Sequence, residues 1–242
     1  MVKIRGLIAA AGSGSRSGLT YPKTLFPVKG KPILVRILGL LEHVDAQLTI
    51  IVSPKGHDAV VKCLDEHKFS ANLVVQPEPL GMGDAVLRFK NSPSFKDAEH
   101  VLLVWGDIPF IQQSTVAELV KAHVGNNNDF TLITRVVDEA YTLVKRNEEG
   151  CVVGIEETRE AKNISPQPGE RDIGLFLFRK DPVINLLEQE LAGKYGQVTG
   201  EHGFLYIIQH LALQGYKVQG LPIATELDLV SLNAMEDLKS FI

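Results

Sequence analysis

Hydrophobic and polar residues follow two different patterns along this chain. In the first half, short runs in which nearly every residue is apolar alternate with stretches in which apolar residues recur every three or four positions. Continuous apolar runs are typical of strands buried on both faces of a parallel sheet, and the longer spacing is typical of helices that cover it. The predicted strands are one that carries Ile4, Leu7 and Ile8 and those at residues 48–52, 73–75 and 101–105.

Helices are predicted between these strands, and local signals mark where some of them begin. Pro32 is expected at the first helical position of a helix whose apolar face spans residues 33–41. Thr115 followed by Glu118 predicts a capping box for a helix that ends near His123. The other two helices are predicted at residues 58–67 and 84–90. Strands that alternate with helices predict a three-layer α/β fold around a doubly wound, mostly parallel sheet.

The second half of the chain has a different pattern, in which strands follow one another with little helix between them. This pattern predicts an antiparallel insertion packed against the main sheet. Its strands are expected at residues 130–137, 141–146, 151–157 and 173–179. Helices are expected at 181–191, 203–213 and 234–242, a strand at 217–222, and a loop at 163–170. We therefore expect one domain, 1–242, with two different halves, 1–125 and 126–242.

The composition narrows the class of protein. The 242 residues carry 25 Lys and Arg against 29 Asp and Glu, a net charge of −4 that leaves no basic field to hold nucleic acid. No apolar run approaches the ~18 residues of a membrane span, and the run that follows Lys3 and Arg5 is too short for a signal peptide. Cys63 and Cys151 stand apart, as expected for free buried thiols in a reducing compartment. We therefore expect a cytoplasmic protein.

The end of the first predicted strand carries the most informative motif. Three alanines are followed by two glycines, so that little side chain covers the backbone of the loop. Exposed backbone N–H groups are suited to phosphate oxygens, and Arg16 and Lys23 place two cations nearby. The loop therefore predicts a phosphate site formed by Ala9, Ala10, Ala11, Gly12 and Gly14.

Two familiar phosphate motifs do not fit this loop. The spacing of Gly12, Gly14 and Gly18 departs from G-x-G-x-x-G, and Ser53 rather than an acidic residue follows the second strand, which argues against a dinucleotide site. The residues after Gly30 do not complete a P-loop either. A tight strand-to-helix turn without a ligand stays open, although it leaves the flanking cations unexplained.

Residues 9–31, A-A-A-G-S-G-S-R-S-G-L-T-Y-P-K-T-L-F-P-V-K-G-K, resemble the signature of the sugar-phosphate nucleotidyltransferases. The spacing from Arg16 to Lys23 is similar to that of the N-acetylglucosamine-1-phosphate uridylyltransferases. The resemblance implies a Rossmann-like, GT-A-like fold with a nucleotide-binding first half and a sugar-binding second half. It also implies Mg²⁺-dependent transfer of a nucleotidyl group from an NTP, with UTP preferred, to N-acetylglucosamine 1-phosphate or a related hexose 1-phosphate, with release of pyrophosphate.

Further segments extend the resemblance over nearly the whole chain. Residues 76–85, Q-P-E-P-L-G-M-G-D-A, are similar to the family's Q-x-E-x-L-G-T-G-x-A, in which the residues matching Gln76 and Gly81 meet the uracil edge. Residues 105–109 resemble Y-G-D-x-P, which implies that Asp107 binds the metal, and Asn233 matches the second metal ligand. Plainer interpretations stay open for these residues: a surface amide, an Asp turn and an Asn helix cap.

The resemblance also implies a role for each charged group. The backbone of residues 10–14 would hold the triphosphate, Arg16 would neutralise the leaving pyrophosphate, and Lys23 would bridge the α-phosphate and the incoming sugar phosphate. Because a phosphate monoester is already nucleophilic at neutral pH, no general base is required, and catalysis consists of positioning and charge neutralisation. The seven histidines are scattered, and we expect most of them at surface or capping positions, with His202 a candidate for the acceptor pocket.

The sugar pocket departs most from the family. Glu157 matches the glutamate that holds sugar hydroxyls, but Thr142 replaces a glycine and Asp172 replaces an asparagine. Met82 also replaces a threonine near the nucleotide. An Asp carboxylate cannot donate a hydrogen bond as an amide does, so the sequence fixes the reaction class better than the acceptor.

Two other functions therefore stay open: a cytidylyltransferase for another phosphorylated small molecule, and a non-catalytic nucleotide or sugar-nucleotide sensor. The family's bifunctional members carry a further C-terminal acetyltransferase domain, and because this chain ends at Ile242 we expect no second activity. The expected partners are an NTP and a sugar 1-phosphate, without nucleic acid or membrane. The oligomeric state is open, with a homodimer as one candidate.

Overall fold

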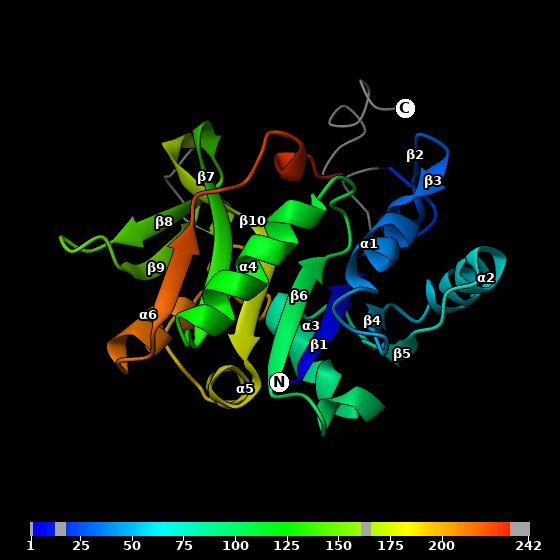
Figure 1. Ribbon diagram of the computed structural model, residues 1–242, viewed down its shortest axis with the longest axis horizontal. Helices are drawn as coiled ribbons and strands as arrows, with labels where there is room; N and C mark the ends of the chain where they lie inside the picture. The colour runs from blue at the N-terminus through cyan, green and yellow to red at the C-terminus, as the bar shows by residue number, and fades with distance from the viewer. Residues whose placement is uncertain (1, 13–17, 161–165, 233–242) are drawn as a thin grey trace.

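A seven-stranded sheet runs through the centre of the molecule, in the order β11-β7-β10-β6-β1-β4-β5 (Figure 1). The computed structural model describes residues 2–12, 18–160 and 166–232. Neighbouring strands β6, β1, β4 and β5 are parallel, as the continuous apolar runs predict. Their bounds are Ile4–Ala9 for β1, Thr49–Val52 for β4, Asn72–Val75 for β5 and His100–Trp105 for β6.

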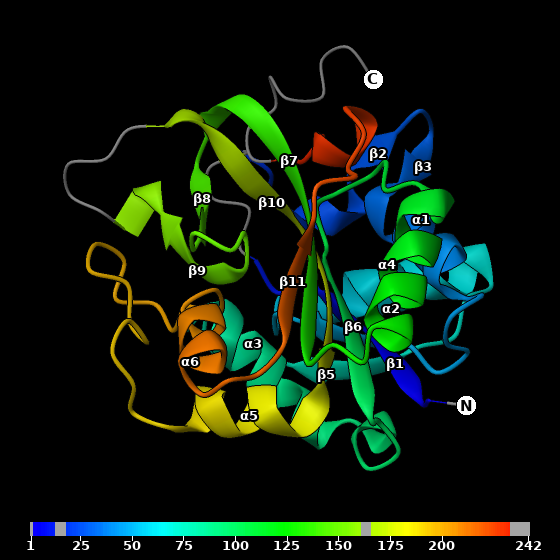
Figure 2. The same ribbon diagram turned by 60° about the vertical axis from the view of Figure 1, so that its left-hand side comes forward.

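Helices cover both faces of this sheet, which confirms the three-layer architecture. One face packs its buried side chains against α1 (Ile33–Leu41), α2 (His57–His67) and α4 (Gln113–Gly125). The other face packs against α3 (Met82–Arg88), α5 (Lys180–Glu188) and α6 (Ile207–Leu213) (Figure 2). The alternation follows from the pleat of β1, because Leu7 and Ile8 point into opposite cores.

The second half adds strands to the same sheet and one separate hairpin. β10 (Gln167–Arg179) lies antiparallel between β6 and β7 (Phe130–Ala140), and β11 (Val218–Leu221) is parallel to β7. β8 (Thr142–Arg146) and β9 (Val152–Glu157) form an antiparallel pair separate from the main sheet. The predicted antiparallel insertion is therefore divided between the main sheet and this hairpin.

β10 takes up the last four residues of the loop predicted at 163–170, so that prediction is wrong from Gln167 onward. Gln167 pairs with Ala140 of β7, and Glu170 accepts hydrogen bonds from the Thr134 hydroxyl and the Arg146 guanidinium. These contacts hold a Pro- and Gly-containing stretch in an extended conformation. Residues 163–165 lie outside the described part of the chain.

Two helix-start signals have different roles in the structure. Pro32 ends β3 (Lys31–Pro32), which pairs with β2 (Pro27–Val28), and α1 begins only at Ile33. α4 begins at Gln113, so Thr115 is already helical and does not cap it. Helices α5 and α6 are shorter than predicted, and residues 234–242 lie outside the described residues. Single 3-10 turns lie at Lys23–Leu25, Phe89–Asn91, Pro93–Phe95, Thr158–Glu160 and Leu227–Leu229.

The cysteine and histidine predictions hold only in part. Both cysteines are free, but only Cys63 is buried and Cys151 is exposed. His123 is fully buried, where its ring nitrogens contact His100 at 2.8 Å and Thr131 at 2.8 Å. Burial, together with the neighbouring His100, lowers the pKa of His123 to about 4. None of the helices in the described residues is long and apolar enough to cross a membrane.

Asp228 holds in place the segment of residues 222–232, which follows β11. Its carboxylate is fully buried and accepts hydrogen bonds from the backbone N–H of Gln112 at 2.7 Å and of Thr225 at 2.7 Å. The hydroxyls of Thr115 and Thr225 also donate to it. The segment is thereby tied to the start of α4.

Replacing Asp228 should therefore destabilise the fold. We expect Asp228→Ala to lower the free energy of unfolding by about 3 kcal/mol, because buried donors lose a charged acceptor. Urea unfolding of the purified protein measures this. Glu226→Ala is the matched control, since Glu226 is 90% exposed in the same turn and should change the free energy by less than about 0.5 kcal/mol. Equal effects of the two variants would contradict the assignment.

Candidate active site

The carboxyl ends of β1 and β6 bring two of the predicted loops together. Ala9 lies beside Trp105 in the sheet, and the next residue, Gly106, donates its N–H to the Ala9 carbonyl at 2.9 Å. A Cβ atom on Gly106 would lie 2.8 Å from that carbonyl oxygen and 3.1 Å from Ala10 Cα. Only glycine therefore permits this approach, which places Asp107 next to the glycine loop, where open α/β sheets bind ligands.

Lys23, Asp107 and Leu232 form the centre of the candidate site. The Lys23 Nζ donates to the Asp107 carboxylate and, at 3.2 Å, to the Leu232 carbonyl. The Leu232 N–H in turn donates to the Asp107 carbonyl at 2.9 Å. The Lys23 and Asp107 side chains are 21% and 13% exposed, so both are accessible from solvent. The predicted partners Arg16 and Asn233 lie outside the described residues.

The glycine loop is less free than its sequence suggests. Ala9 is a strand residue, and the Ala10 N–H donates to the Ile51 carbonyl at 2.9 Å, so the expectation of a free N–H at Ala10 is wrong. The N–H groups of Ala11 and Gly12 donate to no other residue in the described part of the chain. A Cβ on Gly12 would contact the Lys23 Cε at 3.8 Å, so the lysine passes beside the bare backbone. Gly14 lies outside the described residues.

Gln76 follows β5 and is held by both ends of its own loop. Its side chain is buried, and its Nε2 donates to the Gly81 carbonyl at 3.0 Å and to the Asp84 Oδ2 at 2.9 Å. Both amide hydrogens of Gln76 are therefore engaged within the protein. The expectation that Gln76 offers a ligand both a donor and an acceptor is wrong for the donor. What remains is the acceptor Oε1, to which no residue in the described ranges donates a hydrogen bond.

The segment around His202 explains both glycines of this loop. The His202 N–H donates to the Leu80 carbonyl at 2.7 Å, and the Gly83 N–H donates to the His202 carbonyl at 2.9 Å. Gly81 has φ +107°, and a Cβ there would lie 2.4 Å from the His202 carbonyl oxygen. A Cβ on Gly83 would lie 2.6 Å from the His202 ring. His202 thus braces the Gln76 loop, a role that the sequence analysis missed.

Two of the three predicted acceptor residues contact each other. The Thr142 hydroxyl donates to the Asp172 Oδ1 at 2.6 Å, and the Gly174 N–H donates to the Asp172 Oδ2 at 2.9 Å. Thr142 is 2% and Asp172 0% exposed, and burial raises the pKa of the Asp172 carboxyl. The expectation that Asp172 faces a sugar is therefore not met, because both of its carboxylate oxygens accept hydrogen bonds inside the protein.

Glu157 stays accessible. It lies opposite Thr142 in the β8–β9 hairpin, its side chain is 18% exposed, and it accepts a hydrogen bond from the Arg159 Nε at 3.0 Å. Partial burial raises the pKa of its carboxyl. Of the three acceptor candidates, Glu157 is the one whose carboxylate is placed to meet a ligand.

A cavity of about 400 Å³ lies next to these residues, lined by Tyr141, Arg171 and Ser231 among others. The Arg171 guanidinium lies 4.1 Å from the centre of the Tyr141 ring and donates to its hydroxyl at 2.9 Å. Burial raises the pKa of Tyr141. Because Ser231 directly precedes Leu232, the cavity adjoins the Lys23 cluster. Sequence reasoning missed Tyr141 and Arg171, although each directly precedes a predicted acceptor residue.

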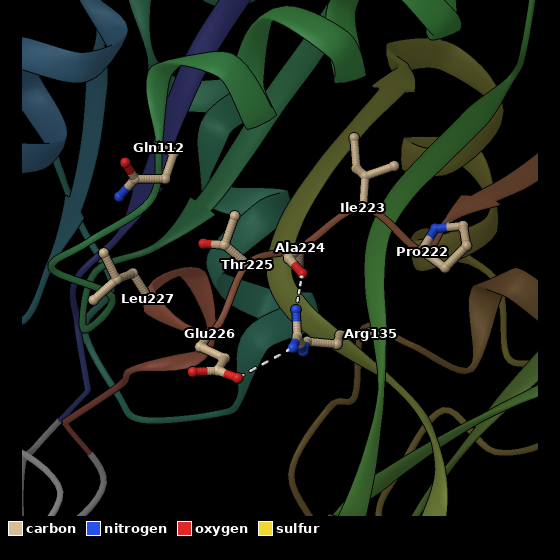
Figure 3. A pocket seen from close by; sticks show the side chains of 8 residues that line it. All are labelled: Gln112, Arg135, Pro222, Ile223, Ala224, Thr225, Glu226 and Leu227. Carbon is tan, nitrogen blue, oxygen red and sulfur yellow. Dashed lines mark hydrogen bonds and ion pairs between the residues drawn. The ribbon is translucent and has the colours of Figure 1, made fainter.

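A larger cavity of about 630 Å³ contains none of the predicted residues (Figure 3). There Arg135 donates to the Ala224 carbonyl at 2.7 Å and forms an ion pair with Glu226 at 3.5 Å (Figure 3). Of the eight described residues that line this cavity, one is a cation and one is an acid, and none belongs to the motifs of the resemblance.

Asp107 is the described residue that fits a magnesium ion. Mg²⁺ is usually held by one or two carboxylates together with phosphate oxygens and waters. In the described ranges, no group of three His, Cys, Asp or Glu side chains could hold a metal by itself. An accessible carboxylate beside a phosphate loop is compatible with an ion that the nucleotide helps to bind.

The buried Asp172 should give the stability a characteristic pH dependence. Because its pKa is raised in the folded protein, its contribution is greatest below the ordinary value of 3.8 and falls as the pH rises through the raised pKa. In Asp172→Asn the amide oxygen can accept from the Gly174 N–H and the amide nitrogen can donate to the Thr142 hydroxyl, and the side chain cannot ionise. We therefore expect this variant to gain stability relative to the parent as the pH rises, measured by urea unfolding at several pH values. A difference that does not change with pH, or the same change in the exposed-site control Asp181→Asn, would contradict this.

Similar proteins support the resemblance. "Bifunctional protein GlmU" of Marinomonas sp. is 32% identical over 231 residues, which cover 94% of this chain and 49% of that protein. The protein of the same name from Pseudothermotoga lettingae is 30% identical over 189 residues, 76% of this chain and 40% of that protein. The chain thus spans about half the length of the curated relatives it matches, or less.

A solved structure shows the same fold. A putative glucose-1-phosphate thymidylyltransferase from Bacillus anthracis, in complex with a sucrose, superimposes with a TM-score of 0.76 at 18% identity, over 98% of this chain and 93% of that one. This likeness confirms the α/β architecture around a mostly parallel central sheet. The model of the MobA-like NTP transferase domain matches residues 6–211, which include the glycine loop, the Gln76 loop and Asp107. The chain therefore belongs to the MobA-like NTP transferase domain family.

Proposed function

We propose that this protein transfers a nucleotidyl group from an NTP to a sugar 1-phosphate and releases pyrophosphate. The observation that carries the proposal is the cluster of Lys23 and Asp107 beside the backbone of Ala11 and Gly12, at the edge of the sheet. Membership of an NTP transferase family and the similarity to GlmU proteins support it. The two free cysteines suit the reducing cytoplasm, where we place the reaction.

The chemistry needs charge neutralisation before anything else. A sugar phosphate oxygen must approach the α-phosphorus of a triphosphate, and both groups are anions. The N–H groups of Ala11 and Gly12 would orient the phosphates, and the Lys23 ammonium would neutralise the oxygens between donor and acceptor. We propose that Asp107, with Asn233, holds Mg²⁺, which supplies positive charge at the α-phosphate when bound.

The Gln76 loop favours a base with an imide. Because both Nε2 hydrogens of Gln76 are engaged, its Oε1 accepts a hydrogen bond from the ligand. The N3–H of uracil or thymine is such a donor, whereas N3 of cytosine is an acceptor. This favours UTP over CTP and argues against the cytidylyltransferase alternative. UTP is preferred over dTTP because of the resemblance to uridylyltransferases.

The acceptor pocket differs from the one that the resemblance to the uridylyltransferases implies. With Thr142 and Asp172 closed on each other, Glu157, Tyr141 and Arg171 are the groups left to meet the acceptor. N-acetylglucosamine 1-phosphate is the first candidate, and related hexose 1-phosphates follow it. The closed Thr142–Asp172 pair is also the observation that would suit a sensor without turnover.

Pyrophosphate release with each of four NTPs and several sugar 1-phosphates tests the proposal. We expect turnover with UTP and at least one hexose 1-phosphate, and dependence on added Mg²⁺. Absence of turnover with every pair, together with tight binding of a UDP-sugar, would contradict the proposed enzyme and favour a non-catalytic sensor.

Removing either charged group of the central cluster should abolish turnover. We expect Lys23→Ala and Asp107→Ala each to lower the rate by about 10²–10³, the usual cost of a lost charge-stabilising contact. Thermal unfolding should show that both variants fold. Lys62→Ala, on an exposed face of α2, should keep the parent's rate. A rate close to the parent's in either site variant would refute the assigned roles.

A further inference from the structure

We propose that Asp84 and Arg88 form a positioning pair that sets base selection by fixing which way the Gln76 amide faces. The inference rests on the proposed function, because it assigns the residues that determine the nucleotide of that site. The motif that the chain resembles leaves position 84 unspecified, so the pair is a property of this chain.

The geometry of the pair leaves Gln76 one orientation. Asp84 lies in the first turn of α3, and Arg88 ends the same helix. The Arg88 Nη2 donates to the Asp84 Oδ1 at 2.8 Å and its Nε to Oδ2 at 3.2 Å, a two-pronged contact that fixes the plane of the carboxylate. Oδ2 also accepts from the Gln76 Nε2 at 2.9 Å.

A carboxylate can only accept hydrogen bonds, so it must face the nitrogen of the Gln76 amide. If the amide turned over, its Oε1 would face the Asp84 Oδ2 and the Gly81 carbonyl, two acceptors, and both hydrogen bonds would be lost. Arg88 supports this arrangement because it compensates the charge of Asp84, whose side chain is only 12% exposed.

The orientation of Gln76 determines which base edge it can meet. With Nε2 held by Asp84 and Gly81, the group left for the base is Oε1, an acceptor for an imide N–H. A reversed amide would present Nε2, a donor suited to N3 of cytosine. Asp84 and Arg88 therefore act on specificity through Gln76, without contact with the base.

Asp84→Asn tests this because an Asn side chain can both donate and accept, which removes one of the two acceptors that oppose the reversed amide and leaves the Gly81 carbonyl. The measurement is the dissociation constant of UTP and of CTP for each variant by titration calorimetry. We expect the ratio of the two constants to fall about tenfold in Asp84→Asn, the size of one hydrogen bond gained or lost. Arg88→Lys keeps the charge but loses the two-pronged contact, and should lower the ratio less.

The control is Glu66→Gln, which removes the acid of another i,i+4 pair, Lys62–Glu66 on α2, and should leave the ratio unchanged. Failure of the parent protein to bind UTP more tightly than CTP would overturn the proposed nucleotide preference itself. A parent that prefers UTP while Asp84→Asn keeps the same ratio would overturn only the positioning role. Equal weakening of both nucleotides would also overturn it, because it would show a purely structural pair. If Asp84→Asn does not fold, Arg88→Lys decides by the same ratio.

Discussion

The close approach of the loops after β1 and β6 is the constraint on which the site depends. At Gly106 the two backbones lie so near that a single methyl group would separate them. A larger residue there would move Asp107 away from the glycine loop and from Lys23. The charge cluster is therefore a consequence of backbone packing between two parallel strands, and the side chains only complete it.

Much of the frame could be predicted from the sequence, because burial on both faces makes the inner strands continuously apolar. β1, β4, β5 and β6 follow this pattern, and the loops after β1, β5 and β6 are those predicted to carry the site. The first half of β10 could not be placed from its own residues, since it is polar and Gly-containing and is held by β7 and by the Arg146–Glu170 pair. Helix starts were shifted by tertiary contacts, as when Asp228 recruits the Thr115 hydroxyl.

The candidate site shows what a sequence motif can and cannot predict. A motif gives residue types at a spacing, so it located Lys23, Asp107 and Gln76, but it could not show which of their atoms are already engaged. The Gln76 amide is occupied by Gly81 and Asp84, and Asp172 is occupied by Thr142 and Gly174. Which hydrogen-bonding atoms are already engaged depends on residues far apart in sequence, such as Thr142 and Asp172.

The hydrogen bond from Lys23 to Leu232 joins residues 209 positions apart. During synthesis, the lysine and the glycine loop are made long before residues 222–232, whose Leu232 carbonyl contacts the lysine. A chain that has folded its parallel sheet but not yet received residues 222–232 thus has a phosphate loop without its final backbone contact. The geometry of the cluster is thus completed only once Leu232 has been synthesised, after most of the sheet.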